Sequence, residues 1–299
     1  MTKILLTGAN GFLGKCIVKN LENNFQISSL SRKLGDYKIS LETTVPQFNH
    51  KFDLVIHAAG KAHTVPKKET EKKKFYDVNV TGTQNLLNGL EIIGVPNQFV
   101  FISSVSVYGK ESGLNISEDQ SLEAKDAYGL SKIRAELLVL EWCEKNNVVC
   151  TILRLPLLVG KNPPGNLGAM IKAIVKGYYF NIGGGKAKKS MVLAEDVAVF
   201  IPTLAKVGGI YNLTDGVHPD FKSLSLVIAK QNNKSKLLNL PIFVAKVFGN
   251  IGNIIGNSAP INSLKLKKIT SDLTFDDTRA RQIGWKPKEV LDYLQTNDI

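Results

Sequence analysis

The chain has 299 residues, 43% hydrophobic and 21% charged, and this balance argues against a disordered protein. Its three cysteines have no paired spacing, which favours buried thiols in a reducing compartment over a disulfide framework or a metal site. The formal charge of +12 comes from scattered basic residues, without the aromatic interleaving of a nucleic-acid interface. No apolar run is long enough to span a bilayer and no signal peptide is recognisable, so we expect a cytoplasmic protein.

The first half of the chain alternates short apolar runs with stretches of helical periodicity, the pattern of a parallel sheet wrapped by helices. The expected strands cover residues 3–7, 26–30, 53–58, 98–103 and 148–153. The expected helices cover residues 12–23, 72–93 and 127–146. This pattern predicts an α/β protein with a Rossmann-like, doubly wound parallel sheet.

The pattern weakens after Pro156, where glycine and proline clusters at 163–165 and 183–185 mark loops. We therefore expect an NAD(P)-binding domain at residues 1–155 and a smaller α/β substrate-binding lobe at residues 156–299. The boundary is soft, because residues 208–213 read as a strand that returns to the first domain. The apolar segment 241–256 is expected to be a helix packed on the second lobe, with contact to a membrane surface as the alternative.

A glycine-rich loop joins the first strand to the first helix. Gly8 permits a tight turn, Gly11 lets backbone N–H groups approach a phosphate, and Gly14 lets the helix pack closely on the strand. The helix N-terminus then stabilises a pyrophosphate. This loop predicts a dinucleotide site whose cofactor-binding residues are Gly8, Asn10, Gly11, Phe12, Leu13 and Gly14.

The end of the second strand bears on the choice of cofactor. A site that prefers NAD usually has an acidic residue there for the ribose 2′-hydroxyl. Here Ser31 and Arg32 follow the strand, and the first acid is Asp36. Arg32 suits a 2′-phosphate, with Ser31 assisting, so NADP(H) is the preferred cofactor. The alternative is that Arg32 is only a surface residue and that NAD(H) binds.

Tyr128 and Lys132 are four residues apart and share one face of the predicted helix. An ammonium about 4 Å from the phenol favours the phenolate, which is expected to lower the pKa of Tyr128 toward the working pH. The hydroxyl-rich segment 103–109 follows a strand end, where ligands gather in parallel sheets. These residues predict acid–base chemistry at a hydroxyl or carbonyl oxygen.

Together these features resemble the extended short-chain dehydrogenase/reductase family, in its branch of nucleotide-sugar epimerases, dehydratases and 4-ketoreductases. The resemblance runs along nearly the whole chain. Besides the glycine loop and the Tyr128/Lys132 pair, the matching segments are 53–59, 79–82, 103–109, 154–160, 195–198, 211–212 and 283–287.

The resemblance implies roles for the matching residues. Tyr128 would be the catalytic acid–base, Lys132 would hold the nicotinamide ribose and Ser104 would bind the reacting oxygen. Asn79 would orient the chain near the nicotinamide, unless it only starts a helix. Further expected cofactor contacts are Ala58, Ala59, Gly60 and Pro156. Further expected substrate contacts are Ser106 and Lys189.

The resemblance further implies a nucleotide-sugar substrate, a role in polysaccharide biosynthesis and a homodimer. Lys161, Lys186, Lys188 and Lys189 are candidates for the substrate diphosphate. His57 is expected to end a buried strand, His63 is a weaker ligand candidate, and Asp196 is expected to cap a helix.

Two departures from the family pattern bear on the reaction. Val105 occupies the position where dehydratases have an aspartate, which argues against 4,6-dehydration. Residues 155–158 lack the asparagine of UDP-galactose epimerases and are closer to sugar 4-ketoreductases. Together with Arg32, this favours reduction of a 4-keto sugar by NADPH. The alternatives are C4 epimerisation of a nucleotide sugar, or the same chemistry on a lipid-linked sugar.

Overall fold

A computed structural model of the chain describes residues 1–299 except 63–65, 67, 235–236, 256–261 and 298. Its main element is a seven-stranded sheet with the order β11-β7-β5-β4-β1-β2-β3, in which every neighbouring pair is parallel. These strands are β1 (Lys3–Thr7), β2 (Gln26–Ser31), β3 (Tyr37–Lys38), β4 (Leu54–His57), β5 (Gln98–Ser104), β7 (Val149–Leu155) and β11 (Gly209–Asn212). The predicted α/β class is confirmed.

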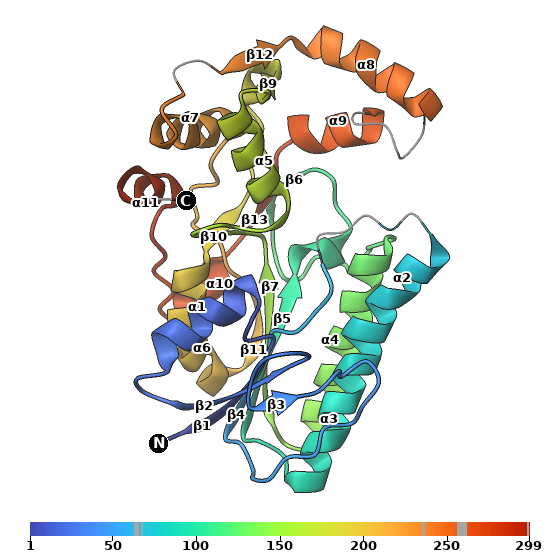
Figure 1. The fold of residues 1–299 in the computed structure, drawn as a ribbon, viewed down its shortest axis with the longest axis vertical. Helices are drawn as coiled ribbons and strands as arrows, with labels where there is room; N and C mark the ends of the chain where they lie inside the picture. Colours follow the sequence, from blue (N-terminus) through green and yellow to red (C-terminus); the bar gives the residue numbers. More distant parts are fainter. Residues whose placement is uncertain (63–65, 67, 235–236, 256–261, 298) are drawn as a thin grey trace.

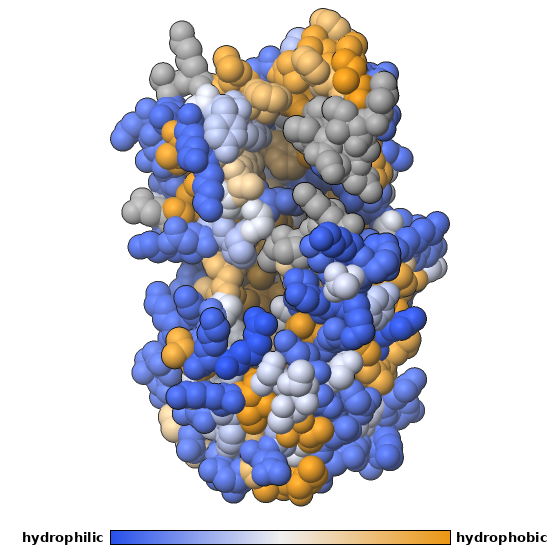
Figure 2. All heavy atoms as spheres, turned by 45° about the vertical axis from the view of Figure 1, so that its right-hand side comes forward, coloured by the Kyte–Doolittle hydropathy of each residue, from blue (hydrophilic) through white to orange (hydrophobic). Residues whose placement is uncertain are grey.

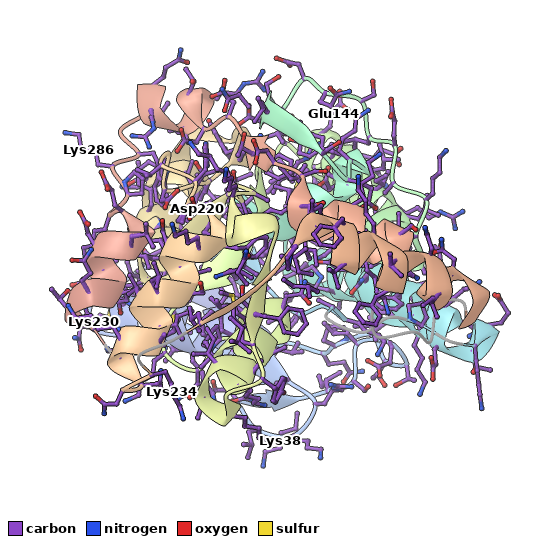
Figure 3. The ribbon with its side chains drawn as sticks, turned by 90° about the horizontal axis from the view of Figure 1, so that it is seen from above. Lys38, Glu144, Asp220, Lys230, Lys234 and Lys286 are labelled. Carbon is purple, nitrogen blue, oxygen red and sulfur yellow. The ribbon has the colours of Figure 1, made fainter. Side chains whose placement is uncertain are left out.

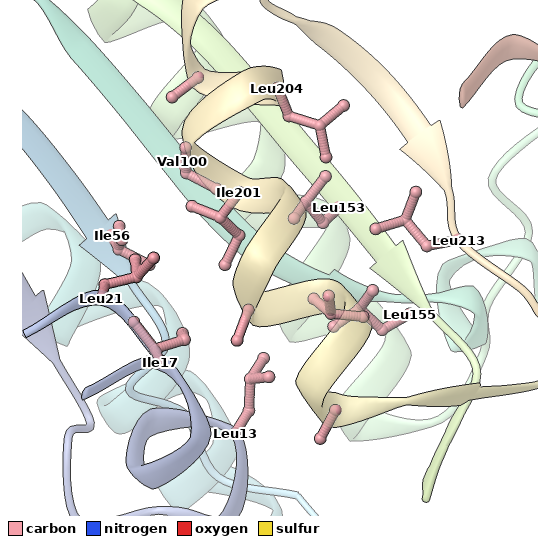
Figure 4. Packing of buried hydrophobic residues seen from close by; sticks show 14 of the residues in the cluster. Leu13, Ile17, Leu21, Ile56, Val100, Leu153, Leu155, Ile201, Leu204 and Leu213 are labelled. Atoms are coloured by element: carbon pink, nitrogen blue, oxygen red, sulfur yellow. The ribbon is translucent and has the colours of Figure 1, made fainter. Parts of the chain in front are cut away.

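Helices cover both faces of this sheet, as Figure 1 shows. One face carries α1 (Phe12–Leu21) and α6 (Ala194–Val207), and the other carries α3 (Gly82–Ile93) and α4 (Ala127–Lys145). The core under α1 and α6 is made of apolar side chains from these helices and from β4, β5 and β7 (Figure 4). A second core lies under α3 and α4. The sheet is therefore doubly wound, with its strands buried on both faces.

A smaller α/β lobe lies at one end of the molecule (Figure 1). It contains three two-stranded sheets, which pair β8 with β10, β9 with β12 and β6 with β13. Their strands are β6 (Gly113–Ile116), β8 (Leu157–Val159), β9 (Phe180–Ile182), β10 (Met191–Leu193), β12 (Leu238–Leu240) and β13 (Leu273–Phe275). The helices of this lobe are α5 (Gly165–Lys176), α7 (Phe221–Gln231), α8 (Ile242–Ile255), α9 (Ser263–Thr270) and α11 (Val290–Thr296), whereas α10 (Thr278–Gln282) packs beside the large sheet.

The structure differs from the sequence prediction in two respects. The helix expected over residues 72–93 is divided into α2 (Glu69–Tyr76), a π-helical turn at Asp77–Thr81 and α3. The extra residue of a π turn redirects side chains, and here it places Asn79 inside the protein. The strands β3 and β9, of two and three residues, were not expected, because such short segments carry too little periodicity.

Candidate active site

The glycine loop after β1 leaves no room for side chains. Gly8 has a φ of +74°, and a Cβ atom there would lie 2.7 Å from the backbone nitrogen of Ala59 and 2.8 Å from the carbonyl of Ala58. A Cβ atom on Gly14 would lie 2.1 Å from the carbonyl oxygen of Gly8. The loop therefore packs backbone against backbone, and only glycine fits at these two positions.

The N-terminus of α1 fits an anion. The helix starts at Phe12 without a side-chain cap and has no acidic residue in its first turn. The first N–H groups of a helix have no partner within it, and the helix dipole favours negative charge at this end. Leu13 is buried in the core, which fixes the helix on the sheet. The glycine loop and the N-terminus of α1 thus offer the N–H groups and the positive end of the dipole that a pyrophosphate requires.

The end of β2 is tied to the glycine loop by Asn10. Its side-chain amide donates to the Ser31 hydroxyl at 2.8 Å and to the Leu34 carbonyl at 2.9 Å. Asp36 turns back to the strand and accepts hydrogen bonds from the Ser29 N–H and hydroxyl, which lower its pKa. Arg32 is 71% exposed and its guanidinium lies 3.9 Å from the Glu42 carboxylate. Asp36, the first acid after the strand, is therefore bonded to Ser29, and the Arg32 side chain stays accessible to solvent.

Three hydroxyl groups meet where β5 ends. Ser104 is the last residue of β5, and its hydroxyl lies 3.0 Å from that of Ser106. The Tyr128 phenol is near enough to the Ser104 side chain for that hydroxyl to lower its pKa. Ser103 points elsewhere and bonds the carboxylate of Glu136. Ser104, rather than Ser103, therefore faces Tyr128.

Two residues not anticipated from the sequence position Tyr128 at the start of α4. The Asp126 carboxylate caps the helix and accepts hydrogen bonds from the N–H groups of Tyr128 and Gly129, both at 3.1 Å. A Cβ atom on Gly129 would lie 2.4 Å from the Ala124 side chain and 2.9 Å from the Ser106 carbonyl. The glycine therefore lets the helix start approach the Ser104–Ser106 turn. The signals were a capping aspartate and a glycine beside the tyrosine.

The pKa of Tyr128 is raised above its ordinary value, because the phenol is desolvated by burial, while the Ser104 hydroxyl lowers it and the Asp126 carboxylate raises it. The expectation that Lys132 lowers this pKa is wrong in this structure. The Lys132 ammonium instead donates to the Ile102 carbonyl at 2.7 Å and lies 4.5 Å from the Phe101 ring centroid. Burial lowers the pKa of Lys132 to about 8, with Glu136 opposing the shift.

Asn79 and Gly60 form the wall beside this lysine. A Cβ atom on Gly60 would lie 3.4 Å from the Lys132 ammonium and 3.3 Å from the Asn79 amide oxygen. That oxygen accepts from the Lys61 N–H at 2.7 Å, and the Asn79 amide donates to the Ser131 hydroxyl at 2.9 Å. Asn79 is thus buried between the loop after β4 and α4, and does not start a helix. Its side chain holds Gly60 beside Lys132.

His57 ends β4 and is fully enclosed. The Thr83 hydroxyl donates to the Asn79 carbonyl, so it accepts from Nε2 of His57 at 2.9 Å. Nδ1 then accepts from the Thr7 hydroxyl at 2.6 Å. Burial and the nearby Lys132 lower the pKa of His57 to about 3, so the imidazole is neutral. His57 joins β1, β4 and α3, and no exposed atom is left for a ligand.

A buried ion pair between β7 and α4 lies next to the site. The Arg154 guanidinium lies 2.8 Å from the Glu136 carboxylate, and both side chains are almost fully buried. Arg154 also donates to the Tyr108 hydroxyl at 3.2 Å, which in turn donates to the Asn212 amide at 2.8 Å. These bonds connect α4, β7, β11 and the turn after β5. Sequence reasoning did not identify Glu136, because its partners are distant in the chain.

The remaining predicted residues are distributed over both lobes. Pro156 lies between β7 and β8, while Lys161, Lys186 and Lys188 are exposed in the second lobe. Lys189 is half-buried and its ammonium donates to the Ser271 carbonyl at 3.0 Å. Asp196 does not cap α6; its carboxylate accepts from the Lys288 N–H at 2.7 Å, which ties the helix to a later loop. His63 lies outside the described residues.

The fold and this arrangement define a dinucleotide-dependent enzyme of the short-chain dehydrogenase/reductase type. A sequence model of the NAD dependent epimerase/dehydratase family matches residues 4–213, and the chain belongs to that family. It is an NAD(P)-dependent enzyme of the epimerase and oxidoreductase kind.

Two curated relatives align over most of their length. The N-acetyl-alpha-D-glucosaminyl-diphospho-ditrans,octacis-undecaprenol 4-epimerase of Escherichia coli O157:H7 is 29% identical, over 94% of this chain and 89% of the relative. The UDP-glucose 4-epimerase of Vibrio cholerae is 27% identical, over 96% and 92%. Among solved structures, RMD from Pseudomonas aeruginosa complexed with NADPH has a TM-score of 0.76 at 20% identity, over 98% of this chain and 97% of that one, which shows the shared fold.

Proposed function

We propose that this enzyme inverts the C4 hydroxyl of a hexose carried on a diphosphate. The observation that carries this proposal is the Tyr128 phenol next to the Ser104 hydroxyl, with Lys132 one turn further along the same helix. The two curated relatives described above are named as 4-epimerases and align along nearly their whole length. Their names favour epimerisation over the 4-keto reduction expected from the sequence.

The proposed roles follow from the contacts of each side chain. Tyr128, as its phenolate, takes the proton of the C4 hydroxyl, and the phenol so formed returns it to the 4-keto oxygen, while the Ser104 hydroxyl orients the same oxygen. Lys132 keeps donor capacity after its bond to the Ile102 carbonyl, enough to bond a ribose beside Gly60. A bound NAD(P) supplies a hydride acceptor and donor. The uncapped α1 and the side-chain-free loop at Gly8 and Gly14 are the groups that fit its pyrophosphate.

Reduction of a 4-keto sugar by NADPH is the second candidate, and Arg32 favours it. Arg32 is exposed at the end of β2, whereas Asp36 is occupied by Ser29. A guanidinium there suits a 2′-phosphate, and NADPH is the reduced cofactor that a reductase consumes. An epimerase returns its hydride to the same sugar, so it consumes no cofactor.

The substrate carrier is part of the proposal. A nucleoside diphosphate sugar is the substrate class that the family resemblance implies. The name of the Escherichia coli relative adds a polyprenyl diphosphate sugar as the second possibility. Both carriers present a diphosphate, for which the half-buried Lys189 and the exposed Lys186 and Lys188 are the proposed cationic partners.

The test is to incubate the purified protein with each sugar and each cofactor. The panel contains UDP-GlcNAc, UDP-glucose, undecaprenyl-diphospho-GlcNAc and 4-keto-6-deoxy sugars linked to UDP, dTDP or GDP. Formation of the C4 epimer without net change in the reduced nicotinamide is expected. Stoichiometric NADPH oxidation by a 4-keto sugar, with no epimer from any other substrate, would replace epimerisation with reduction.

A further inference from the structure

The helix α8 presents large apolar side chains to solvent. Four of them are more than half exposed: Phe243 (68%), Val247 (57%), Phe248 (52%) and Ile251 (51%). The side that packs on the protein consists instead of small residues, Ala245, Gly249 and Gly252, which are buried. A helix on the surface of a soluble domain normally has the reverse arrangement, with its large apolar residues toward the core.

The small residues explain how α8 is held. A Cβ atom added to Gly249 would lie 3.5 Å from the Ser263 nitrogen and 3.6 Å from a methyl carbon of Leu266, so the helix backbone lies close to the start of α9. The Asn253 amide donates to the Ser263 hydroxyl at 2.8 Å. The small residue Gly249 and the polar residue Asn253 therefore lie against the start of α9, while the phenylalanines of α8 are more than half exposed.

The apolar surface continues onto the neighbouring sheet. Leu238 of β12 is 64% exposed, Phe180 of β9 is 43% exposed, and the two residues are paired in register. Figure 2 shows apolar side chains gathered at this end of the molecule, where α8 lies. We call Phe180, Leu238, Phe243, Val247, Phe248 and Ile251 the outer apolar face. Continuous apolar surface of this kind marks an interaction site.

The segment of the chain that includes α8 and α9 has lysines and no acidic residue of its own, and one of these lysines, Lys268, pairs with Glu111 at 3.0 Å. Residues 221–271 contain no aspartate or glutamate, and their eight lysines supply +8 of the formal charge of +12. Lys246 is exposed on α8, and Lys267 is exposed on α9. Lys230 of α7 and Lys234 after it lie on the other side of the view from α8 (Figure 3). The lysines are Lys222, Lys230, Lys234, Lys236, Lys246, Lys265, Lys267 and Lys268.

We propose that the outer apolar face docks onto an anionic lipid bilayer. Apolar side chains beside lysines are the composition of helices that lie in a membrane interface, where each cation near the surface adds attraction to anionic lipid. No helix among the described residues is long and apolar enough to cross a membrane, so the contact is peripheral. A second copy of the chain fits less well, because it would bring the same lysines together.

The proposal is independent of the reaction, and flotation of the full-length protein with vesicles tests it. Vesicles of equal parts phosphatidylglycerol and phosphatidylcholine are expected to carry the protein, and vesicles of phosphatidylcholine alone are expected to carry much less. Binding should fall as salt is added, since salt screens the lysines. Phe243→Ser combined with Phe248→Ser is expected to lower the partition coefficient about tenfold or more, because two apolar anchors are lost.

The matched control replaces exposed apolar residues of the other lobe, Ile92→Ser with Leu137→Ser, which are 74% and 50% exposed on α3 and α4. This variant is expected to float like the unchanged protein. Equal flotation of the α8 variant and the control would overturn the proposal. So would equal binding to both vesicle types, or a dimer in sedimentation that the α8 substitutions dissociate while no vesicle binds. Unchanged thermal unfolding of both variants excludes loss of folding as the cause.

Discussion

The glycine loop after β1 and the segments that meet at the end of β5 lie at the same edge of the sheet. The loop is built from backbone atoms, whereas the second region is built from side chains. At Gly8 and Gly14 the backbone packs on backbone, and no titratable side chain occurs between residues 8 and 14. At Ser104, Tyr128 and Lys132 the site consists of side chains, and burial has shifted the pKa values of Tyr128 and Lys132. The first region is therefore sensitive to added atoms, and the second to removed ones.

Removal of the Tyr128 phenol oxygen should have the largest effect. Tyr128→Phe is expected to lower kcat about 10²–10⁴-fold, the contribution of a positioned acid–base, because the phenol is the proposed proton relay. Cofactor affinity, measured by fluorescence titration, should stay within about twofold, since only the phenol oxygen is lost. Tyr178→Phe, at an exposed tyrosine of the second lobe, is the control and should leave kcat unchanged. Near-normal activity of Tyr128→Phe would remove this residue from the mechanism.

Addition of one methyl group to the glycine loop after β1 should lower both stability and cofactor affinity. Gly14→Ala places a Cβ atom 2.1 Å from the Gly8 carbonyl oxygen, and is expected to cost about 3 kcal/mol of unfolding free energy and most of the cofactor affinity. Gly177→Ala is the matched control, because its φ is +80° but nothing lies within 4 Å of the added atom. The control should cost about 1 kcal/mol, from backbone strain alone. Urea unfolding measures both; equal losses would show that the clash at Gly14 is relieved.

The dependence of stability on pH distinguishes the two regions, because Tyr128 and Lys132 are titratable and the glycine loop has no titratable side chain. Burial lowers the pKa of Lys132 from its ordinary 10.5 to about 8. Between these values the unfolded chain holds a proton that the folded chain has released, so stability rises with pH through this window. Between pH 8 and 10.5 the free energy of unfolding of the unchanged protein should rise, relative to that of Lys132→Met, by roughly 3 kcal/mol at most. Urea unfolding from pH 8 to 10.5 tests it, and a constant difference would contradict the pKa of about 8.

Substitution of Arg32 should have the smallest effect, because its side chain is exposed after the end of β2. Arg32→Ala is expected to weaken NADPH binding about tenfold through loss of a charge-assisted bond, and to leave NADH binding unchanged. Isothermal titration measures both constants, with Lys19→Ala on α1 as the control for general loss of charge. Equal NADPH affinity before and after the change would leave NAD as the better assignment.

Much of the fold could be predicted from the sequence, because long buried strands are nearly continuous apolar runs. The segments 53–58 and 98–103 read clearly as strands, and the structure has β4 and β5 there. The two-residue strand β3 and the π turn at Asp77–Thr81 could not be predicted in this way. Their geometry depends on pairing with β2 and on burial of Asn79, which are tertiary contacts.

The site shows the same division between local and distant contacts. The loop at Gly8 and Gly14 and the pair of Tyr128 and Lys132 follow from spacing within one turn or helix. The bond of Lys132 to the Ile102 carbonyl joins residues 30 positions apart, and the burial of Tyr128 raises a pKa that spacing alone predicts to be lowered. The pair of Glu136 and Arg154 also joins two separate elements, and only the fold brings it together.

The central claim is that hydride leaves and returns at C4 of the sugar. The most direct measurement follows UDP-GlcNAc and undecaprenyl-diphospho-GlcNAc, each deuterated at C4, by NMR and mass spectrometry during incubation with the protein and NAD(P). We predict that the C4 epimer forms from one of them and keeps its deuterium, because the label travels with the hydride and not with the proton that Tyr128 exchanges. An epimer that has lost its deuterium to solvent, or no epimer from either sugar, would contradict the account.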